Sequence, residues 1–90
     1  MGNRNETSRQ NVMRITAYSN AYRRNILKQA EDWSTPEEIS TRGRLPLVTV
    51  ERNITILERC GLLELRAGKY KTHQPSLEFT TELIEKRKQY

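Results

Sequence analysis

The side chains that could do chemistry in this sequence are mainly cationic and hydrogen-bonding groups. Sixteen Lys and Arg residues stand against eleven Asp and Glu, for a net charge of +5. The single cysteine, Cys60, and the single histidine, His73, cannot build an intrachain disulfide or a four-ligand zinc site. The sequence has neither a glycine-rich phosphate loop nor a nucleophile–base signature. We therefore expect a binding protein and not an enzyme, with no cofactor, no metal site and no small-molecule substrate.

The basic residues fall in two blocks that are separated by an acidic one. Residues 1–30 carry six Arg or Lys against one acid, and residues 31–40 carry four acids. Residues 41–75 return to seven basic residues against three acids. A surface polarised in this way favours polyanionic partners. Ordinary solvated surface charge is the alternative interpretation.

The first thirty residues contain a short tail followed by helical sequence. We expect residues 1–6 to form a disordered tail. From about Thr7 to Ala30 there is no Gly or Pro, and apolar residues recur every three or four positions. This spacing is typical of a helix, and Ser19 or Asn20 could cap a second helix. One long helix and two helices hinged at this point both fit the pattern.

Two further helices follow, and each has a recognisable start. Residues 35–38, Thr-Pro-Glu-Glu, contain a capping threonine, a proline suited to the first turn and the glutamate of a capping box. This helix is predicted to stop within residues 42–44, Arg-Gly-Arg. The next helix opens at Leu45-Pro46 and ends at Gly61. The apolar stripe of this second helix consists of Val50, Ile54 and Leu57.

After Gly61 the apolar residues alternate instead of following helical spacing. Residues 62–66 and 69–73 are therefore predicted to be the two strands of a hairpin, with Ala67-Gly68 as its tight turn. A last helix starts at Pro75 or Ser76. We expect one mostly helical α+β domain over residues 7–90, with its core at 20–74 and flanking helices at 7–19 and 76–90.

The stretch "TPEEISTRGRLPLVTVERNITILERCGLLEL" resembles the winged helix-turn-helix DNA-binding domain of small bacterial and archaeal transcription regulators. The likeness lies in a short helix, a turn, a helix with Thr49-Val50 near its start, and Glu58-Arg59-Cys60-Gly61-Leu62-Leu63 leading into a hairpin. It covers residues 23–73. The turn departs from the family pattern because it is rich in arginine and contains Gly43. The resemblance implies a three-helix core with a β-hairpin wing.

The resemblance also implies double-stranded DNA as the partner. The helix that begins at Leu45-Pro46 would read the major groove, and the wing would contact backbone or minor groove. Candidate base-reading residues are Thr49, Glu51, Arg52, Asn53 and Thr55. Arg42 and Arg44 are the candidate phosphate contacts beside the turn, and Arg66, Lys69 and Lys71 are those of the wing. Leu47 and Val48 either join the core or contact thymine methyl groups.

The flanking helices carry apolar residues that one small domain cannot bury, which favours a homodimer. The expected interface residues are Val12, Ile15, Leu77, Leu83 and Ile84. Two recognition helices about 34 Å apart would then read a pseudo-palindromic site. Tyr18, Tyr22 and Trp33 are expected in the core or at this interface. Cys60 is expected to be a small buried hydrophobe, with an intersubunit disulfide or redox switch as the alternative.

A dimeric transcriptional regulator is therefore the function that the sequence favours. A winged-helix protein-interaction module and a sequence-tolerant architectural DNA-binding protein remain as alternatives. No apolar run is long enough to span a membrane, and the N-terminus has no apolar segment typical of a signal peptide. We expect a cytoplasmic, nucleoid-associated protein of prokaryotic or viral origin.

Overall fold

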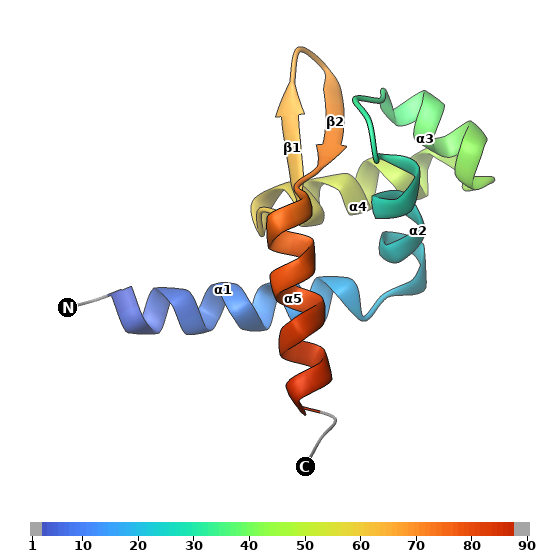
Figure 1. Ribbon diagram of the computed structural model, residues 1–90. Coiled ribbons are helices and arrows are strands. Elements are labelled where there is room, and N and C mark those ends of the chain that lie inside the picture. Colours follow the sequence, from blue (N-terminus) through green and yellow to red (C-terminus); the bar gives the residue numbers. More distant parts are fainter. Residues whose placement is uncertain (1–2, 88–90) are drawn as a thin grey trace.

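The computed structural model describes residues 3–87, with side chains from residue 8 onward. Over this range the chain forms five helices and a two-stranded antiparallel sheet, which confirms the expected mostly helical α+β class (Figure 1). The elements are α1 (Asn3–Tyr18), α2 (Ala21–Gln29), α3 (Pro36–Gly43), α4 (Leu47–Arg59), β1 (Leu63–Arg66), β2 (Lys69–Thr72) and α5 (Gln74–Arg87). None of these helices is long and apolar enough to cross a membrane.

The first helical segment is two helices, divided where a cap was expected. α1 ends at Tyr18 and α2 begins at Ala21. Asn20 has an extended backbone, and its side-chain oxygen accepts a hydrogen bond from the Arg23 backbone N–H at 3.1 Å. Because α1 begins at Asn3, residues 3–6 of the expected disordered tail are helical. Residues 1–2 of that tail, and 88–90 of the last expected helix, lie outside the described residues.

α4 lies at the centre of the domain and contacts α1, α2, α3 and β1. Its predicted apolar stripe is confirmed, because Val50 and Leu57 are fully buried and Ile54 is 4% exposed. Ile26 of α2 and Ile39 of α3 pack in the same core cluster. Burying an aliphatic side chain of this size contributes about 1.5–3 kcal/mol. This face therefore determines how α4 is oriented.

α3 has the predicted start and a closely packed end. The Glu38 N–H donates to Thr35 Oγ1 at 3.1 Å, and the Thr35 N–H donates to Glu38 Oε1 at 2.8 Å, which completes the capping box. Gly43 is the last helical residue, and a Cβ atom there would lie 3.3 Å from Asn25 Nδ2 of α2. The glycine therefore permits the close approach of α2. Arg44 takes the left-handed conformation that ends the helix, with φ of 54°.

β1 and β2 form the predicted hairpin, which we call the wing. Arg66 pairs directly with Lys69 across the antiparallel sheet. Between them, Ala67 and Gly68 have φ angles of 51° and 77°. Two positive φ angles in a two-residue connection are the backbone of a type I′ turn. Gly61, with φ of 83°, makes the preceding turn from α4 into β1.

Two connections that the sequence did not reveal attach the wing and α5 to the rest of the domain. Ser34 and Tyr70 exchange backbone hydrogen bonds of 2.9 and 2.7 Å, and this isolated β-bridge ties the segment before α3 to the wing. α5 begins at Gln74, ahead of the predicted start. His73 precedes it, and His73 Nδ1 accepts a hydrogen bond from the Ser76 N–H at 3.3 Å. α5 then packs against α1 (Figure 1).

The wing turn gives a direct test of its backbone conformation. Ala67→Asn should raise the free energy of unfolding by about 0.5–1 kcal/mol, because asparagine tolerates positive φ better than alanine. Gly68→Ala should have the opposite effect, since the open space around Gly68 leaves only the φ of 77° to oppose a side chain. Thermal unfolding followed by circular dichroism measures both. A lower melting temperature for Ala67→Asn would exclude the type I′ turn.

Candidate nucleic-acid interface

The face of α4 opposite the buried stripe is exposed. Its central residues are Val48, Arg52, Thr55 and Arg59, which follow helical spacing, with Glu51 exposed beside them and Thr49 half-buried. This strip offers hydrogen-bond donors, acceptors and one apolar group. Those are the groups that distinguish base pairs in the major groove. Of the five predicted base-reading residues, Glu51, Arg52 and Thr55 are exposed on α4, and Thr49 is half-buried. Asn53 is the exception.

Asn53 lies on the edge of the buried stripe and does not fit the expected base-reading role. It is 8% exposed, and its Oδ1 accepts a hydrogen bond from Arg23 Nη1 of α2 at 3.1 Å. Its Nδ2 donates to the Thr49 carbonyl at 2.7 Å. The side-chain amide thus joins α2 to α4. The helical period explains the difference, because position 53 follows Val50 by three residues and precedes Leu57 by four.

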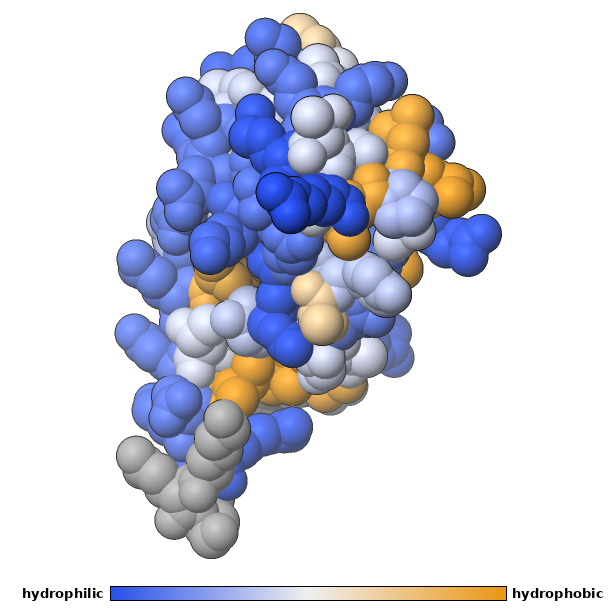
Figure 2. Space-filling view, turned by 90° about the vertical axis from the view of Figure 1, so that its right-hand side faces the viewer, coloured by the Kyte–Doolittle hydropathy of each residue, from blue (hydrophilic) through white to orange (hydrophobic). Residues whose placement is uncertain are grey.

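Leu47 and Val48 are placed at the start of α4 with different exposure. Leu47 is 36% exposed and Val48 is 61% exposed. The exposure of Val48 excludes a core position, and its contact with a thymine methyl group stays a prediction. The side of the domain shown in Figure 2 is mostly hydrophilic and carries separate hydrophobic patches.

Several arginines donate hydrogen bonds to the carbonyl groups at helix ends. The end of a helix leaves backbone carbonyls unpaired and carries partial negative charge. The contacts are Arg23 Nε to the Ala17 carbonyl (2.7 Å) and Arg24 Nη1 to Tyr18 (2.9 Å) at the end of α1, Arg42 Nη2 to Gln29 (2.8 Å) at the end of α2, and Arg14 Nε to Cys60 (2.8 Å) after α4. The net charge therefore overstates the positive charge that is free to meet a partner.

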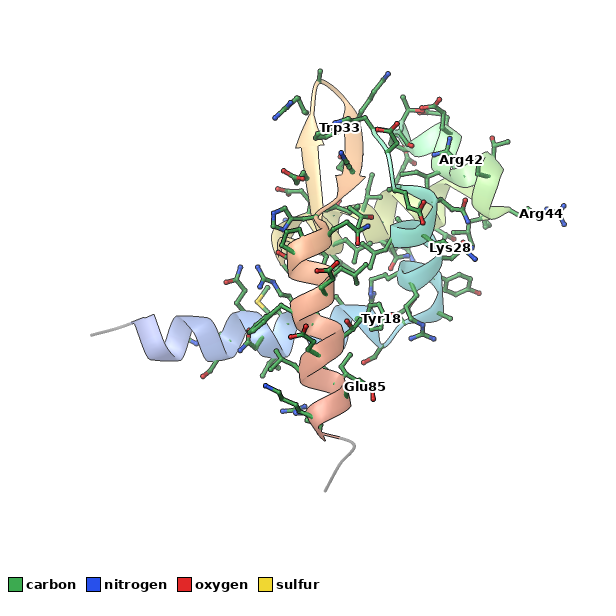
Figure 3. All side chains as sticks on the ribbon, viewed as in Figure 1. Tyr18, Lys28, Trp33, Arg42, Arg44 and Glu85 are labelled. Carbon is green, nitrogen blue, oxygen red and sulfur yellow. The ribbon has the colours of Figure 1, made fainter. Side chains whose placement is uncertain are left out.

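Arg42 and Arg44, the two predicted phosphate contacts beside the turn, lie in different environments (Figure 3). Arg42 Nη2 donates to the Gln29 carbonyl and also to Ser34 Oγ. Its guanidinium thus links α3 to the chain after α2, and because the residue is exposed, its expected phosphate contact stays a prediction. Arg44 is exposed and extends from the end of α3 away from the domain (Figure 3). Arg44 remains a candidate phosphate contact.

The wing carries its three predicted cations on one face of the hairpin. The register pairs Arg66 with Lys69 and Glu64 with Lys71, and alternation puts all four side chains on the same side. Arg66 and Lys69 are exposed, and Lys71 is half-buried. Trp33, which was expected in the core or a dimer interface, is half-buried and contacts this face. Its ring centroid lies 5.1 Å from Arg66 Cζ and 5.9 Å from Lys71 Nζ.

The N-terminus of α3 places an acidic group near these cations. Hydrogen bonds with Thr35 lower the pKa of the Glu38 carboxyl below its ordinary value, and the positive charges of Lys69 and Arg42 lower it further. Lys69 of the wing is thus close enough to α3 to act on Glu38. The carboxylate offsets part of the positive charge at this end of the wing.

Cys60 is the small buried hydrophobe that the sequence predicted. Its side chain belongs to the core cluster, and the residue is 1% exposed. Sγ donates to the Leu57 carbonyl at 3.4 Å, and burial raises the pKa of the thiol. The alternative of an intersubunit disulfide or redox switch does not fit, because a covered thiol with a raised pKa forms little thiolate and cannot reach a partner.

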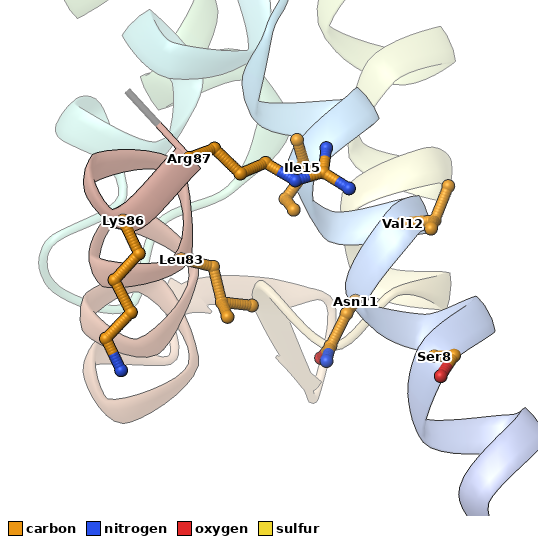
Figure 4. A pocket seen from close by; sticks show the side chains of 7 residues that line it. All are labelled: Ser8, Asn11, Val12, Ile15, Leu83, Lys86 and Arg87. Atoms are coloured by element: carbon orange, nitrogen blue, oxygen red, sulfur yellow. The ribbon is translucent and has the colours of Figure 1, made fainter. Parts of the chain in front are cut away.

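The flanking helices leave an apolar groove between them (Figure 4). A cavity of about 370 Å³ separates Val12 and Ile15 of α1 from Leu83 of α5, with Arg87 reaching across toward Ile15. Val12 is 54% exposed, and the neighbouring Met13 is 48% exposed. The other predicted interface residues, Leu77 and Ile84, are half-buried. Leu77 packs against the core of its own chain, so its burial needs no partner.

No family model and no curated protein matches the sequence. Solved structures do resemble it in fold. An ArsR-like transcriptional regulator from Rhodococcus sp. RHA1 superimposes with a TM-score of 0.75 at 21% identity, over 90% of this chain and 81% of that chain. NolR from Sinorhizobium fredii superimposes with a TM-score of 0.67 at 14% identity, over 94% of this chain and 91% of that one.

A third structure, from Mycobacterium bovis, is a homodimeric winged helix-turn-helix DNA-binding domain described as a possible ArsR-family transcriptional regulator. It superimposes with a TM-score of 0.69 at 23% identity, over 100% of this chain and 90% of that chain. The three similarities each extend over 90% or more of this chain. The chain has the winged helix-turn-helix fold, with α3 and α4 as the helix-turn-helix and β1–β2 as the wing.

Proposed function

We propose that the protein is a homodimeric transcriptional regulator that binds specific sequences in double-stranded DNA. The observation that carries this proposal is the exposed face of α4, which combines Arg52, Thr55 and Val48 on the side opposite the core. The fold supports it, because the second helix of a helix-turn-helix enters the major groove. The descriptions of the Rhodococcus and Mycobacterium proteins as regulators support it as well. A fold alone also serves other functions, so the side chains of α4 carry the argument.

Each exposed side chain of α4 suits a different base-edge group. The Arg52 guanidinium can donate two hydrogen bonds to guanine O6 and N7, and the Thr49 and Thr55 hydroxyls can donate or accept. The Glu51 carboxylate can accept from a cytosine amine. Val48 offers its methyl groups to the methyl group of thymine. A site that contains guanine and thymine in each half is the sequence class that fits this face.

Phosphate contacts would come from the cations that are not used inside the domain. Arg44 at the turn is exposed and points away from the body of the protein. Lys69 at the wing tip is also exposed. Such contacts position a protein on the duplex and supply salt-dependent affinity without reading sequence. We therefore assign base reading to α4 and phosphate binding to the turn and the wing.

The apolar groove between α1 and α5 is the proposed dimer interface. Val12 and Met13 expose apolar side chains next to this groove, and Ile15 and Leu83 line it in part. A second copy would cover them, and two-fold symmetry would present two α4 helices to successive major grooves. The homodimeric state of the Mycobacterium domain supports this arrangement. A monomer would leave the exposed residues in water.

The test of the proposed function is binding to a mixed pool of duplexes across a salt series, with the bound sequences recovered and read. A two-fold symmetric motif, with affinity that falls steeply as salt rises, is the expected result. Salt-dependent binding without sequence enrichment would indicate an architectural protein. Absence of binding at low salt would overturn the proposal and favour a protein-interaction module.

Arg52 and Lys69 should affect binding in different ways. Arg52→Ala should weaken binding to the recovered site by about 1–3 kcal/mol and leave random duplex nearly unchanged, because it removes a base contact. Lys69→Ala should lower the affinity for cognate and random duplexes by the same factor. It should also reduce the slope of log affinity against log salt by about one. Fluorescence anisotropy with both duplexes measures these effects. Equal losses on the two duplexes for Arg52→Ala would contradict base reading.

Arg42 and Arg44 form a matched pair that separates stability from binding. Arg42→Met removes hydrogen bonds to Gln29 and Ser34 and should lower the free energy of unfolding by about 1 kcal/mol. Arg44→Met should change stability by less than about 0.5 kcal/mol but weaken binding to all duplexes. Thermal melting and anisotropy provide the two readouts. If both variants have the same melting temperature and lose the same affinity, the different roles proposed for Arg42 and Arg44 are wrong.

The dimer interface can be tested with two exposed apolar residues. Val12→Glu should convert the dimer to a monomer without unfolding it, since Val12 is already 54% exposed within one chain. Phe79→Glu is the control, because Phe79 of α5 is 44% exposed and does not line the groove with Val12. Light scattering at micromolar concentration gives the masses. A monomeric wild-type protein, or a monomer produced equally by both variants, would refute this interface.

A further inference from the structure

Trp33 is held in place beside the wing by its backbone neighbours. Ser34 forms the two-way backbone bridge with Tyr70, and the Trp33 N–H donates to Asp32 Oδ1 at 2.8 Å. Ser34 Oγ also donates to the Asp32 carbonyl at 2.8 Å. The tryptophan therefore directly precedes the residue that is bonded to the wing. It is not a residue of a free loop.

This attachment places the indole ring on the cationic face of the wing. Ser34 pairs with Tyr70, so the residue before Ser34 faces the opposite side of the sheet from Tyr70. Arg66 and Lys71 occupy that same side. Arg66 Cζ lies 5.1 Å and Lys71 Nζ lies 5.9 Å from the centre of the ring, both within the range of a cation–π interaction.

Three cations and the Glu64 carboxylate share this face of the wing. Arg66 lies directly opposite Lys69, and like charges in that position destabilise a hairpin. The negative face of an indole ring attracts cations, and Arg66 and Lys71 are the two cations found over the Trp33 ring. A guanidinium that stacks on a ring uses its flat face, so its N–H donors remain available at its edges. The ring can thus hold Arg66 without occupying the donors that would bind phosphate.

We propose that Trp33 is a positioning residue for binding of the DNA backbone by the wing. It holds Arg66 and Lys71 side by side, and the N–H donors of these cations that are not turned toward the ring bind phosphate groups. The proposal rests on the proposed DNA-binding function. Trp33 thus becomes part of the candidate interface, although it precedes Arg66 by 33 positions. In this proposal Trp33 itself does not contact DNA.

The test compares wild type, Trp33→Leu and Trp33→Phe on one duplex across a salt series. Trp33→Leu should weaken binding about threefold to tenfold at about 0.1 M salt and lower the slope of log affinity against log salt by about one. Trp33→Phe should fall between, because phenylalanine keeps a weaker aromatic face. Melting curves check folding, and a purely structural tryptophan would change them without changing the salt slope. If Trp33→Leu does not fold, Trp33→Phe supplies the same comparison.

A double-mutant cycle asks whether Trp33 acts through the wing cations. Trp33→Leu combined with Arg66→Gln should weaken binding little more than Arg66→Gln alone, since both changes disrupt one unit. Lys69→Gln is the control, because Lys69 lies at the turn and is not one of the two cations described over the ring. Its effect should add to that of Trp33→Leu. Additive effects for both pairs would overturn the positioning role.

The protein contains one tryptophan, so its fluorescence reports on this contact directly. Arg66→Gln and Lys71→Gln should each change the tryptophan emission of the free protein, while Lys69→Gln should not. If wild type binds DNA and the Trp33 variants bind it with the same affinity and the same salt slope, this proposal is overturned. The proposed function then remains intact. If wild-type protein binds no duplex, the proposed function fails, and the positioning role fails with it.

Discussion

The burial of one face of α4 is the constraint on which the rest of the domain depends. Val50, Ile54 and Leu57 are in the core, and α4 contacts α1, α2, α3 and β1. A helix buried along one stripe has a single favourable rotation about its axis. That rotation directs Arg52 and Thr55 outward, and it places Gly61 where the chain turns into the wing. The core and the candidate interface are thus opposite sides of one helix, so a change that rotates α4 would disturb both.

A small helical domain has many helix ends for its size, and arginine satisfies several of them here. The guanidinium suits this task because it is always charged and presents several N–H donors in one plane. Arg14, Arg23 and Arg42 donate to carbonyls at three different helix ends. Arg44, Arg52 and Arg59 are exposed on α4 or before it. Some of the basic residues therefore stabilise the fold, and others are free to bind a polyanion. The net charge does not distinguish these two groups.

The wing shows how stability and binding can share the same side chains. Arg66 and Lys69 lie opposite one another at the end of a short hairpin, which weakens that hairpin. The bridge between Ser34 and Tyr70 adds backbone hydrogen bonds at its base, and Trp33 lies against two of its cations. A two-stranded hairpin alone is marginal in water. Its attachment to the segment before α3 makes the wing part of the domain.

The sequence by itself determined the features whose causes are local. The capping box at Thr35, the turn at Ala67-Gly68 and the stripe on α4 all depend on residues a few positions apart, and all are present. The sequence allowed a cap at Ser19 or Asn20, and the structure has it at Asn20. The environments of Asn53, Arg42 and Trp33 were decided by tertiary structure. Asn53 meets Arg23 across 30 positions, and Trp33 meets cations of a distant hairpin. Such partners leave no periodic signal, because only the folded backbone brings them within hydrogen-bond or cation–π distance.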